Sequence, residues 1–258
     1  MSGLLVIFPT FEAIDTVKKV FPSVLKEVEK TKSHLIVHDT SIKQKTEKSK
    51  YFHDLKKSNN FFLIESDNLS MARSRNLCLR LGVDLFNPEY IMMLEDDHGL
   101  EKGAIRMLTK LMDRYYDKKM PNNLKAGLFS CCHKHNDFNK KITVDKDAFV
   151  PSINSSIRGI GGTNSCFRCA PTLHWLNILK GYDNDEYLIS TFQTNNLNLR
   201  NYHSGYTVLY TKKIFTFDDD RVGFGYTYNK EKIFGRYEKK RWDDKYTASD
   251  KRSKFIKD

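Results

Sequence analysis

The stretch YIMMLEDD, residues 90–97, decides the fold, because an apolar run is followed at once by three acids. A short, continuous apolar run predicts a strand buried on both faces, which is typical of a parallel sheet. Three adjacent carboxylates repel one another unless a cation is near, and their oxygen atoms suit Mg²⁺ or Mn²⁺. The stretch therefore predicts a central strand that ends in a metal site, although an isolated acidic triplet is more often a solvated loop before a helix.

Apolar runs and helical patterns alternate along the first half of the chain. Strands are predicted at 4–8, 34–38 and 61–64, and helices at 13–30, 43–58, 70–81 and 101–116. Pro22 is expected to kink or split the first helix, and Gly82 to cap the third. The second half is less regular, with strands predicted at 126–132 and 206–210, helices at 171–180 and 186–202, and a loop at 133–160. The alternation predicts an α/β fold with a mainly parallel sheet flanked by helices.

Length and composition fit one globular domain. The chain has 258 residues, of which 40% are hydrophobic, and this is enough to bury a core. The five cysteines are odd in number, so we expect free thiols and a cytoplasmic protein. No stretch is apolar for long enough to cross a bilayer, and residues 1–10 lack the pattern of an export signal. The net charge of +11 favours polyanionic partners without naming one.

Polar residues follow the predicted strands where ligands bind in open parallel sheets, beyond the carboxyl ends. They come after the first, second and fourth strands: Thr10 and Glu12, then Asp39 and Ser41, then Glu95, Asp96 and Asp97. A cation held by the last group could bridge two phosphates of a nucleoside diphosphate and neutralise the charge of a leaving group. The set therefore indicates a nucleotide-dependent transfer reaction.

In this order the segments resemble glycosyltransferase family 2 from Leu4 to about Tyr210. The resemblance implies the GT-A, Rossmann-like fold with a mixed, mainly parallel sheet. The resemblance implies a metal-dependent enzyme that moves a sugar from a nucleotide-sugar, such as a UDP-sugar, to a hydroxyl group. It also implies a donor site formed by two segments and an aspartate that contacts the base: Pro9, Thr10, Phe11 and Glu12; Arg73 and Arg75 within the ARSRN helix; and Asp39. We expect a GT-A domain at 1–210 and a basic, aromatic-rich tail at 211–258 that packs on the site or closes over it.

The acidic triplet stands where the family has its DxD motif. The resemblance implies that Asp97 ligates Mn²⁺ or Mg²⁺ and that Asp96 lies near the ribose. Glu95 replaces the usual first aspartate, and its longer side chain fits a metal ligand or a ribose contact. The resemblance also places Gly162, in a glycine-containing turn, before the acceptor side. His203 is a further candidate metal ligand, although a surface histidine is the more frequent role for such a residue.

The general base of the family is missing from its usual place. Where the family has an acidic motif, the chain has QTNN at 193–196, and neither an amide of glutamine nor one of asparagine accepts a proton usefully at neutral pH. The base could instead be Asp183, Asp185 or Glu186. Alternatively, the enzyme retains the anomeric configuration and needs no such base, or it is inactive.

The net charge of the chain is the one sequence feature that bears on the class of acceptor. A hydroxylated base in DNA would suit the net charge of +11, and a lipid-linked or polysaccharide acceptor is the alternative. A non-catalytic module that binds nucleotides or nucleic acid is a further alternative. A nucleotidyltransferase is disfavoured, because the first strand is not followed by a glycine- and lysine-rich loop. Zinc is also disfavoured, because the cysteines at 131, 132, 166 and 169 do not have the spacing of a usual finger or ribbon.

Overall fold

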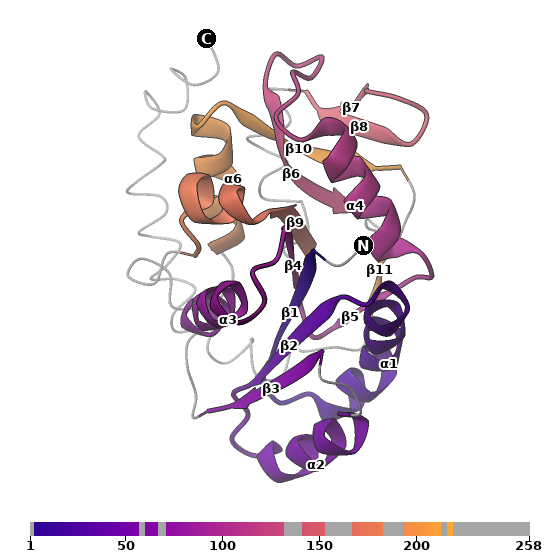
Figure 1. The fold of residues 1–258 in the computed structure, drawn as a ribbon, viewed down its shortest axis with the longest axis vertical. Helices are drawn as coiled ribbons and strands as arrows, with labels where there is room; N and C mark the ends of the chain where they lie inside the picture. The colour runs from indigo at the N-terminus through magenta and orange to yellow at the C-terminus, as the bar shows by residue number, and fades with distance from the viewer. Residues whose placement is uncertain are drawn as a thin grey trace.

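The computed structural model describes residues 3–56, 60–66, 71–131, 141–152, 167–182, 193–212 and 216–218. Within these residues a nine-stranded sheet has the order β3-β2-β1-β4-β9-β6-β10-β8-β7, and β11 pairs with β5 (Figure 1). The strands are β1 Leu4–Thr10, β2 His34–Asp39, β3 Phe61–Glu65, β4 Tyr90–Leu94, β5 His98–Leu100, β6 Lys125–Cys131, β7 Lys141–Thr143, β8 Ala148–Pro151, β9 Phe167–Pro171, β10 Tyr206–Thr211 and β11 Thr216–Asp218. The helices are α1 Ile14–Thr31, α2 Lys45–Leu55, α3 Met71–Phe86, α4 Ala104–Tyr115, the π-helix η1 His174–Leu179 and α6 Gln193–His203.

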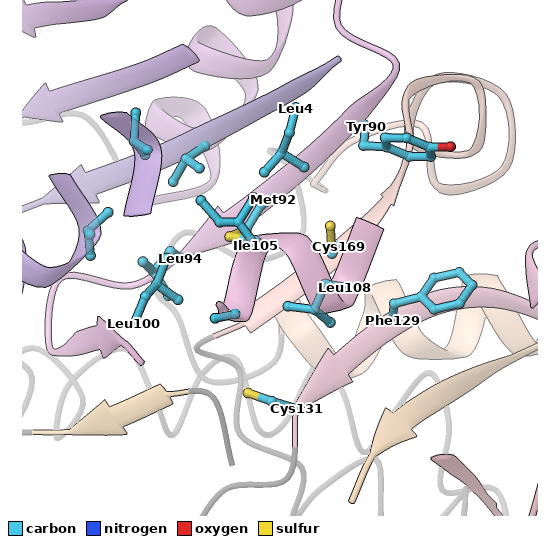
Figure 2. Packing of buried hydrophobic residues seen from close by; sticks show 14 of the residues in the cluster. Leu4, Tyr90, Met92, Leu94, Leu100, Ile105, Leu108, Phe129, Cys131 and Cys169 are labelled. Atoms are coloured by element: carbon cyan, nitrogen blue, oxygen red, sulfur yellow. The ribbon is translucent and has the colours of Figure 1, made fainter. Parts of the chain in front are cut away.

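Both faces of the sheet are covered, as the apolar strands require. The side chains of β1 alternate between two buried clusters: Leu4, Val6 and Phe8 belong to one, and Leu5 and Ile7 to the other. The first cluster includes residues of α1, α2 and α4, and the second includes residues of α3, η1 and α6. Figure 2 shows the first cluster, where side chains of α4 meet those of β4. The predicted α/β fold with a mainly parallel sheet is confirmed.

Strand direction defines two edges of the sheet. Strands β1, β2, β3 and β4 are mutually parallel, so their carboxyl ends lie along one edge, here named the carboxyl edge. Strand β9 is antiparallel to both β4 and β6, and β10 is parallel to β6. Strand β10 therefore also runs toward the carboxyl edge, and the segment before it begins from the opposite, amino edge.

The role expected of Gly82 was wrong, and so was one of the two alternatives expected for Pro22. Pro22 does not split the first helix, since α1 continues through it for 18 residues. Gly82 does not cap α3, which extends four residues further, to Phe86. A Cβ atom on Gly82 would lie 2.2 Å from Leu5 Cδ2 and 3.1 Å from Ile36 Cδ1, so the glycine allows α3 to pack closely on β1 and β2. Packing, and not helix termination, explains this residue.

The second half contains strands that the sequence pattern did not indicate. The stretch expected to be a loop contributes β7 and β8, which pair antiparallel with each other. Strand β9 inserts between β4 and β6 in the opposite direction, so the sheet is mixed, as the resemblance implied. The helix predicted at 171–180 is shorter and is a π-helix, η1. Across the described ranges, no helix combines the length and the apolar character that a membrane span requires.

Substitution Gly82→Ala should destabilise the protein by about 1–2 kcal/mol, because overpacking the buried contact with Leu5 outweighs the gain in helix propensity. Chemical denaturation of both proteins measures the change in the free energy of unfolding. Leu85→Ala is the control on the same helix, since Leu85 is 52% exposed and its removal should change stability little. A Gly82→Ala variant as stable as the wild type would contradict this account of α3.

Candidate functional site

The carboxyl ends of β2, β1 and β4 lie side by side at the carboxyl edge. Thr10 and Asp39, the last residues of β1 and β2, are paired in register. The backbone N–H of Thr40 donates to the Thr10 carbonyl at 3.0 Å, which holds the two strand ends together. Pro9 is buried within β1 and precedes this pair. The predicted meeting of the residues that follow the first, second and fourth strands is confirmed.

Asp96 is bound directly to the end of β1. Its Oδ2 accepts hydrogen bonds from the Thr10 hydroxyl at 2.7 Å and from the Phe11 backbone N–H at 3.1 Å. The pKa of Asp96 is raised to about 6, because burial and, to a smaller extent, the charge of Asp97 raise it by more than Lys48 and the two hydrogen bonds lower it. This raised pKa indicates negative charge that the surrounding protein does not fully compensate.

Lys48 lies beneath these strand ends, with a side chain that is 0% exposed. Its Nζ lies 2.6 Å from Thr10 Oγ1, 2.8 Å from the Glu12 carbonyl oxygen, 3.0 Å from Ser41 Oγ and 3.1 Å from Asp39 Oδ1. Burial lowers the pKa of Lys48, while the charges of Asp96, Asp39 and Glu12 oppose that shift. The ammonium group thus links the segments that follow β1 and β2.

The two carboxylate oxygens of Asp39 differ in their hydrogen-bond partners. Oδ1 accepts from the Ser41 hydroxyl at 2.6 Å and from the Ser41 N–H at 3.0 Å, in addition to Lys48. Oδ2 is buried and has no hydrogen-bond partner within the described part of the chain. An unpaired buried acceptor costs about 1–3 kcal/mol, so this oxygen is suited to a ligand that brings a donor.

Glu12 fastens the loop after β1 to the start of α2. Its carboxylate accepts three backbone hydrogen bonds, from Ile42 at 3.0 Å, Lys43 at 2.9 Å and Gln44 at 2.9 Å. Glu12 has a positive φ of 49°, so the chain turns sharply there. Its carboxylate is therefore an anchor for α2, which carries Lys48, and this is a structural role in addition to the predicted place in the nucleotide pocket.

Arg75 and Glu95 form a buried ion pair between α3 and the end of β4. Arg75 Nη2 lies 2.5 Å from Glu95 Oε1, and the guanidinium lies over the Tyr182 ring at 4.9 Å. The side chain of Arg75 is 1% exposed, whereas Arg73, two residues earlier on the helix, is exposed. The structure therefore brings Arg75 and Glu95 into the site and directs Arg73 to the surface. One oxygen of Glu95 is used by Arg75, and Asp96 and Asp97 likewise each use one oxygen within the protein, so this pairing does not rank the three carboxylates as metal ligands.

Two side chains from different helices hold the chain near this ion pair. Asn76 Nδ2 donates to the Tyr182 carbonyl at 2.7 Å, and the Tyr182 N–H donates to Asn76 Oδ1 at 2.8 Å. Arg200 of α6 donates from Nη2 to the Gly181 carbonyl at 2.8 Å and from Nη1 to the Leu179 carbonyl, at 2.5 Å. The segment that contains Asp183, Asp185 and Glu186 follows Tyr182 directly but lies outside the described residues.

Asp97 is partly exposed and follows Asp96 at the carboxyl edge. Its Oδ1 pairs with Nδ1 of the buried His98, the first residue of β5. Strand β11 pairs antiparallel with β5, and this register sets Asp218 opposite His98. The start of the C-terminal region thus lies beside the acidic segment, an arrangement that the sequence pattern did not indicate.

The charges of the described site fit a divalent cation. Apart from Glu12, whose carboxylate is used by three backbone N–H groups, four carboxylates belong to the site, those of Asp39, Glu95, Asp96 and Asp97, against the two buried cations Lys48 and Arg75. Two negative charges therefore remain, and the donors are hard oxygen atoms of the kind that Mn²⁺ and Mg²⁺ bind. Within the described ranges, no group of three metal-binding side chains is preassembled, so a cation would also need donors from its ligand or from water.

His203 is not brought to this site. It is exposed at the end of α6, just before β10, and therefore lies at the amino edge, whereas Asp97 lies at the carboxyl edge. A six-residue strand separates the two edges by about 20 Å, so His203 is too far away to ligate a metal at Asp97. Gly162, Cys132 and Cys166 lie outside the described residues, while Cys131 and Cys169 are buried thiols.

Lys48 and Tyr182 are the site residues that sequence reasoning missed. Lys48 lies in a lysine-rich stretch that is typical of a solvent-exposed helix. The one signal in the sequence is its spacing of four residues from Phe52, which places both residues on the inner face of α2. Tyr182 comes close to Arg75 through tertiary contacts between residues more than 100 positions apart, and no local pattern reports them.

Comparison with known proteins identifies the fold. No protein-family model matches the chain, and no curated protein sequence matches it. Among solved structures, S. aureus TarS 1–349 in complex with UDP-GlcNAc matches with a TM-score of 0.57 and 16% identity, over 85% of this chain and 59% of that one. Mannosyltransferase PcManGT from Pyrobaculum calidifontis, in complex with GDP-Man and Mn²⁺, matches with a TM-score of 0.55 and 14% identity, over 80% of this chain and 53% of that one.

These likenesses show that the chain has a GT-A-type fold, as the sequence resemblance implied. The chain spans between about half and three fifths of the length of these two structures. At such low identity the likeness concerns the fold. Activity has to be argued from the residues of the site.

Substitution Glu12→Gln should lower the stability at pH 7 by about 1–2 kcal/mol, because an amide is a weaker acceptor for the three backbone N–H groups. Burial raises the pKa of Glu12, but the hydrogen bonds from residues 43, 42 and 44 and the charge of Lys48 outweigh this, so that it lies below its ordinary value of 4.5. A carboxylate whose pKa is lower in the folded protein than in the unfolded chain stabilises the fold at every pH above its unfolded-state pKa. This contribution is lost as the pH falls through the folded-state pKa.

The difference in unfolding free energy between the two proteins should therefore narrow below about pH 4.5, which denaturation curves at several pH values measure. Glu47→Gln is the control, since Glu47 is in an exposed ion pair with Lys18 and should contribute little. A difference that stays constant from pH 7 to acid would show that the carboxylate charge has no part in the cap.

Proposed function

We propose that this protein is a metal-dependent glycosyltransferase, which moves a sugar from a nucleotide-sugar donor to a hydroxyl group of an acceptor. The observation that carries the proposal is the joined set of Thr10, Asp39 and Asp96 at adjacent strand ends, with Asp97 next to it. In open α/β sheets this edge is where ligands bind. The GT-A-type fold supports the same reaction class.

The donor nucleotide would bind across β1 and β2. Asp39 Oδ2, buried and without a partner in the described part, is suited to accept an N–H of the base. Uracil and guanine both carry a ring N–H, so a UDP- or GDP-linked sugar fits this acceptor. Thr10, Phe11 and Glu12 lie between Asp39 and Asp96. Asp96 would lie near the ribose of the donor. Pro9 is buried below them and shapes the strand end.

Asp97 would hold Mn²⁺ or Mg²⁺, with Glu95 as a second candidate ligand. When bound there, such an ion neutralises negative charge on the diphosphate leaving group. The buried ion pair of Arg75 with Glu95 keeps a second positive charge near the same edge. Its field would favour the negative charge of the diphosphate.

The general base would come from Asp185 or Glu186. Tyr182, which lies against Arg75, is held by Asn76, so the chain leaves the described region next to the site only a few residues before them. The first residues of α6, Gln193 to Asn196, stand where the family has its acidic motif, and they carry no group that could act as the base. A reaction that retains the anomeric configuration is the alternative, and it would need no such base.

The C-terminal region would close over the donor. Strand β11 lies beside β5, immediately after Asp97, and supports this role. Residues 211–258 contain 14 Lys and Arg against 9 Asp and Glu, a charge that would favour phosphates.

The acceptor that best fits the net charge of +11 is DNA that carries a hydroxylated base. A lipid-linked or polysaccharide acceptor is the second candidate. If the chain had kept the fold but lost catalysis, it would be a nucleotide-binding module, and it would bind nucleotide without transferring sugar.

Substitution Asp97→Asn should lower sugar transfer or nucleotide-sugar hydrolysis by at least about 100-fold, because the metal would lose its principal charged ligand. The measurement is turnover of a panel of nucleotide-sugars with Mn²⁺, followed by mass spectrometry of nucleotide and sugar products. Asp84→Asn, at an exposed position of α3, is the control and should keep full turnover. Equal turnover of the Asp97 variant and the wild type would exclude the metal mechanism, and the anomeric configuration of the product would show whether a base is required.

With a DNA acceptor, transfer to an oligonucleotide that contains a hydroxymethylated base should weaken as salt rises from 50 to 200 mM, by about 10-fold or more, because phosphate contacts release counterions. Mass spectrometry of the oligonucleotide detects the added sugar. An unmodified oligonucleotide of the same sequence is the control. Transfer only to lipid-linked or polysaccharide acceptors would identify the second candidate instead.

A further inference from the structure

We infer that Lys48 is a positioning residue for the donor nucleotide: its buried ammonium group holds Asp39 and Thr10 in the orientations that receive the base and the ribose. The inference rests on the proposed function, since it concerns the same site. Lys48 would not touch the ligand itself, because its side chain is 0% exposed and its ammonium group already donates to Thr10. It acts through the residues that it binds.

The directions of the hydrogen bonds follow from the fact that an ammonium group can only donate. The Thr10 hydroxyl accepts from Lys48 at 2.6 Å, so its own hydrogen is left for Asp96 Oδ2 at 2.7 Å. The Ser41 hydroxyl accepts from Lys48 and from the Glu12 N–H, so its hydrogen goes to Asp39 Oδ1 at 2.6 Å. Both hydroxyl groups are thereby fixed as donors to carboxylates.

The consequence for Asp39 is that all its described partners lie on one oxygen. Lys48 and both polar groups of Ser41 bind Oδ1, and Oδ2 remains buried without a partner in the described part of the chain. This arrangement fixes the carboxylate plane and reserves one acceptor. Without the ammonium group, the Asp39 side chain could rotate and the Thr10 hydroxyl could turn away from Asp96.

Packing alone does not account for a lysine at this position. Phe52, one helical turn away on α2, fills its place in the core with an apolar ring that is 0% exposed. Burying a charge to the same degree costs free energy unless the charge is paired and hydrogen-bonded. Here the four oxygen partners all belong to segments at the ends of β1 and β2, where the donor site is proposed.

The test compares Lys48→Met with Phe52→Leu, a change of similar size on the same helix that touches none of these polar groups. Calorimetry with Mn²⁺ measures the affinity for UDP, for GDP, and for the analogue of each whose ring N–H is replaced by N-methyl. The wild type should bind the better of UDP and GDP more tightly than its methylated analogue by at least about 10-fold, the value of one charge-assisted hydrogen bond.

Lys48→Met should weaken binding of the unmodified nucleotide by about 10- to 100-fold and reduce the discrimination against the methylated analogue to about 3-fold or less. Phe52→Leu should lower the melting temperature but keep both affinity and discrimination. Loss of discrimination is a readout that general destabilisation does not produce, because a destabilised fold binds both nucleotides less well in equal proportion.

A double-mutant cycle with Asp39→Asn tests whether Lys48 acts through Asp39. The double variant should bind no more weakly than Asp39→Asn alone, and it should be more stable than Lys48→Met because no unpaired buried charge remains. If Lys48→Met does not fold, Ser41→Ala replaces it and should reduce the discrimination by about 3- to 10-fold.

Affinity of Lys48→Met within 3-fold of the wild type, or a loss that leaves the discrimination unchanged, would overturn the inference. Unchanged discrimination in Ser41→Ala would do the same where the lysine variant cannot be measured. A wild-type protein that binds neither UDP nor GDP would instead overturn the proposed function, and the inference with it.

Discussion

The balance of charge at the carboxyl edge of the sheet is the constraint on which the rest of the structure depends. The strands β1, β2 and β4 are buried on both faces, so they carry almost no polar side chains until they end. Polar groups are therefore concentrated at one edge, where acids outnumber the buried cations Lys48 and Arg75. Each of these cations is placed by a helix, and each joins a different helix to the strand ends.

The helices on the two faces have complementary tasks. On one face, α2 brings Lys48 under Thr10, and the Glu12 carboxylate fixes the start of that helix. On the other face, α3 packs closely on β1 and β2 because Gly82 has no side chain, and it presents Arg75 to Glu95. A small shift of either helix would separate an ion pair that lies within hydrogen-bond distance, so core packing and site geometry are coupled.

The sequence allowed correct prediction of the first four strands, the helices between them, and the meeting of Thr10, Asp39 and Asp96. Each of these rests on a pattern that is local in the chain, namely an apolar run and the polar residue after it. Prediction was wrong for Gly82 and for β7 and β8 within 133–160, and His203 lies at the surface, the role that the sequence favoured over a metal ligand. Each of these outcomes depends on parts of the chain that are distant in sequence. Gly82 packs on Leu5, and the β7–β8 hairpin pairs with β10. The direction of β10 in the sheet sets the edge at which His203 lies.

By itself, then, the sequence determined the α/β class and the chemical character of the edge, because periodicity and residue type follow from local physical chemistry. Only the tertiary structure decided which charges are paired. Lys48 looks like any solvated lysine in the chain, and Arg75 like one of two similar arginines, until burial selects them. A buried charge is stable only beside its partners, and those partners come together only when the strands and helices pack.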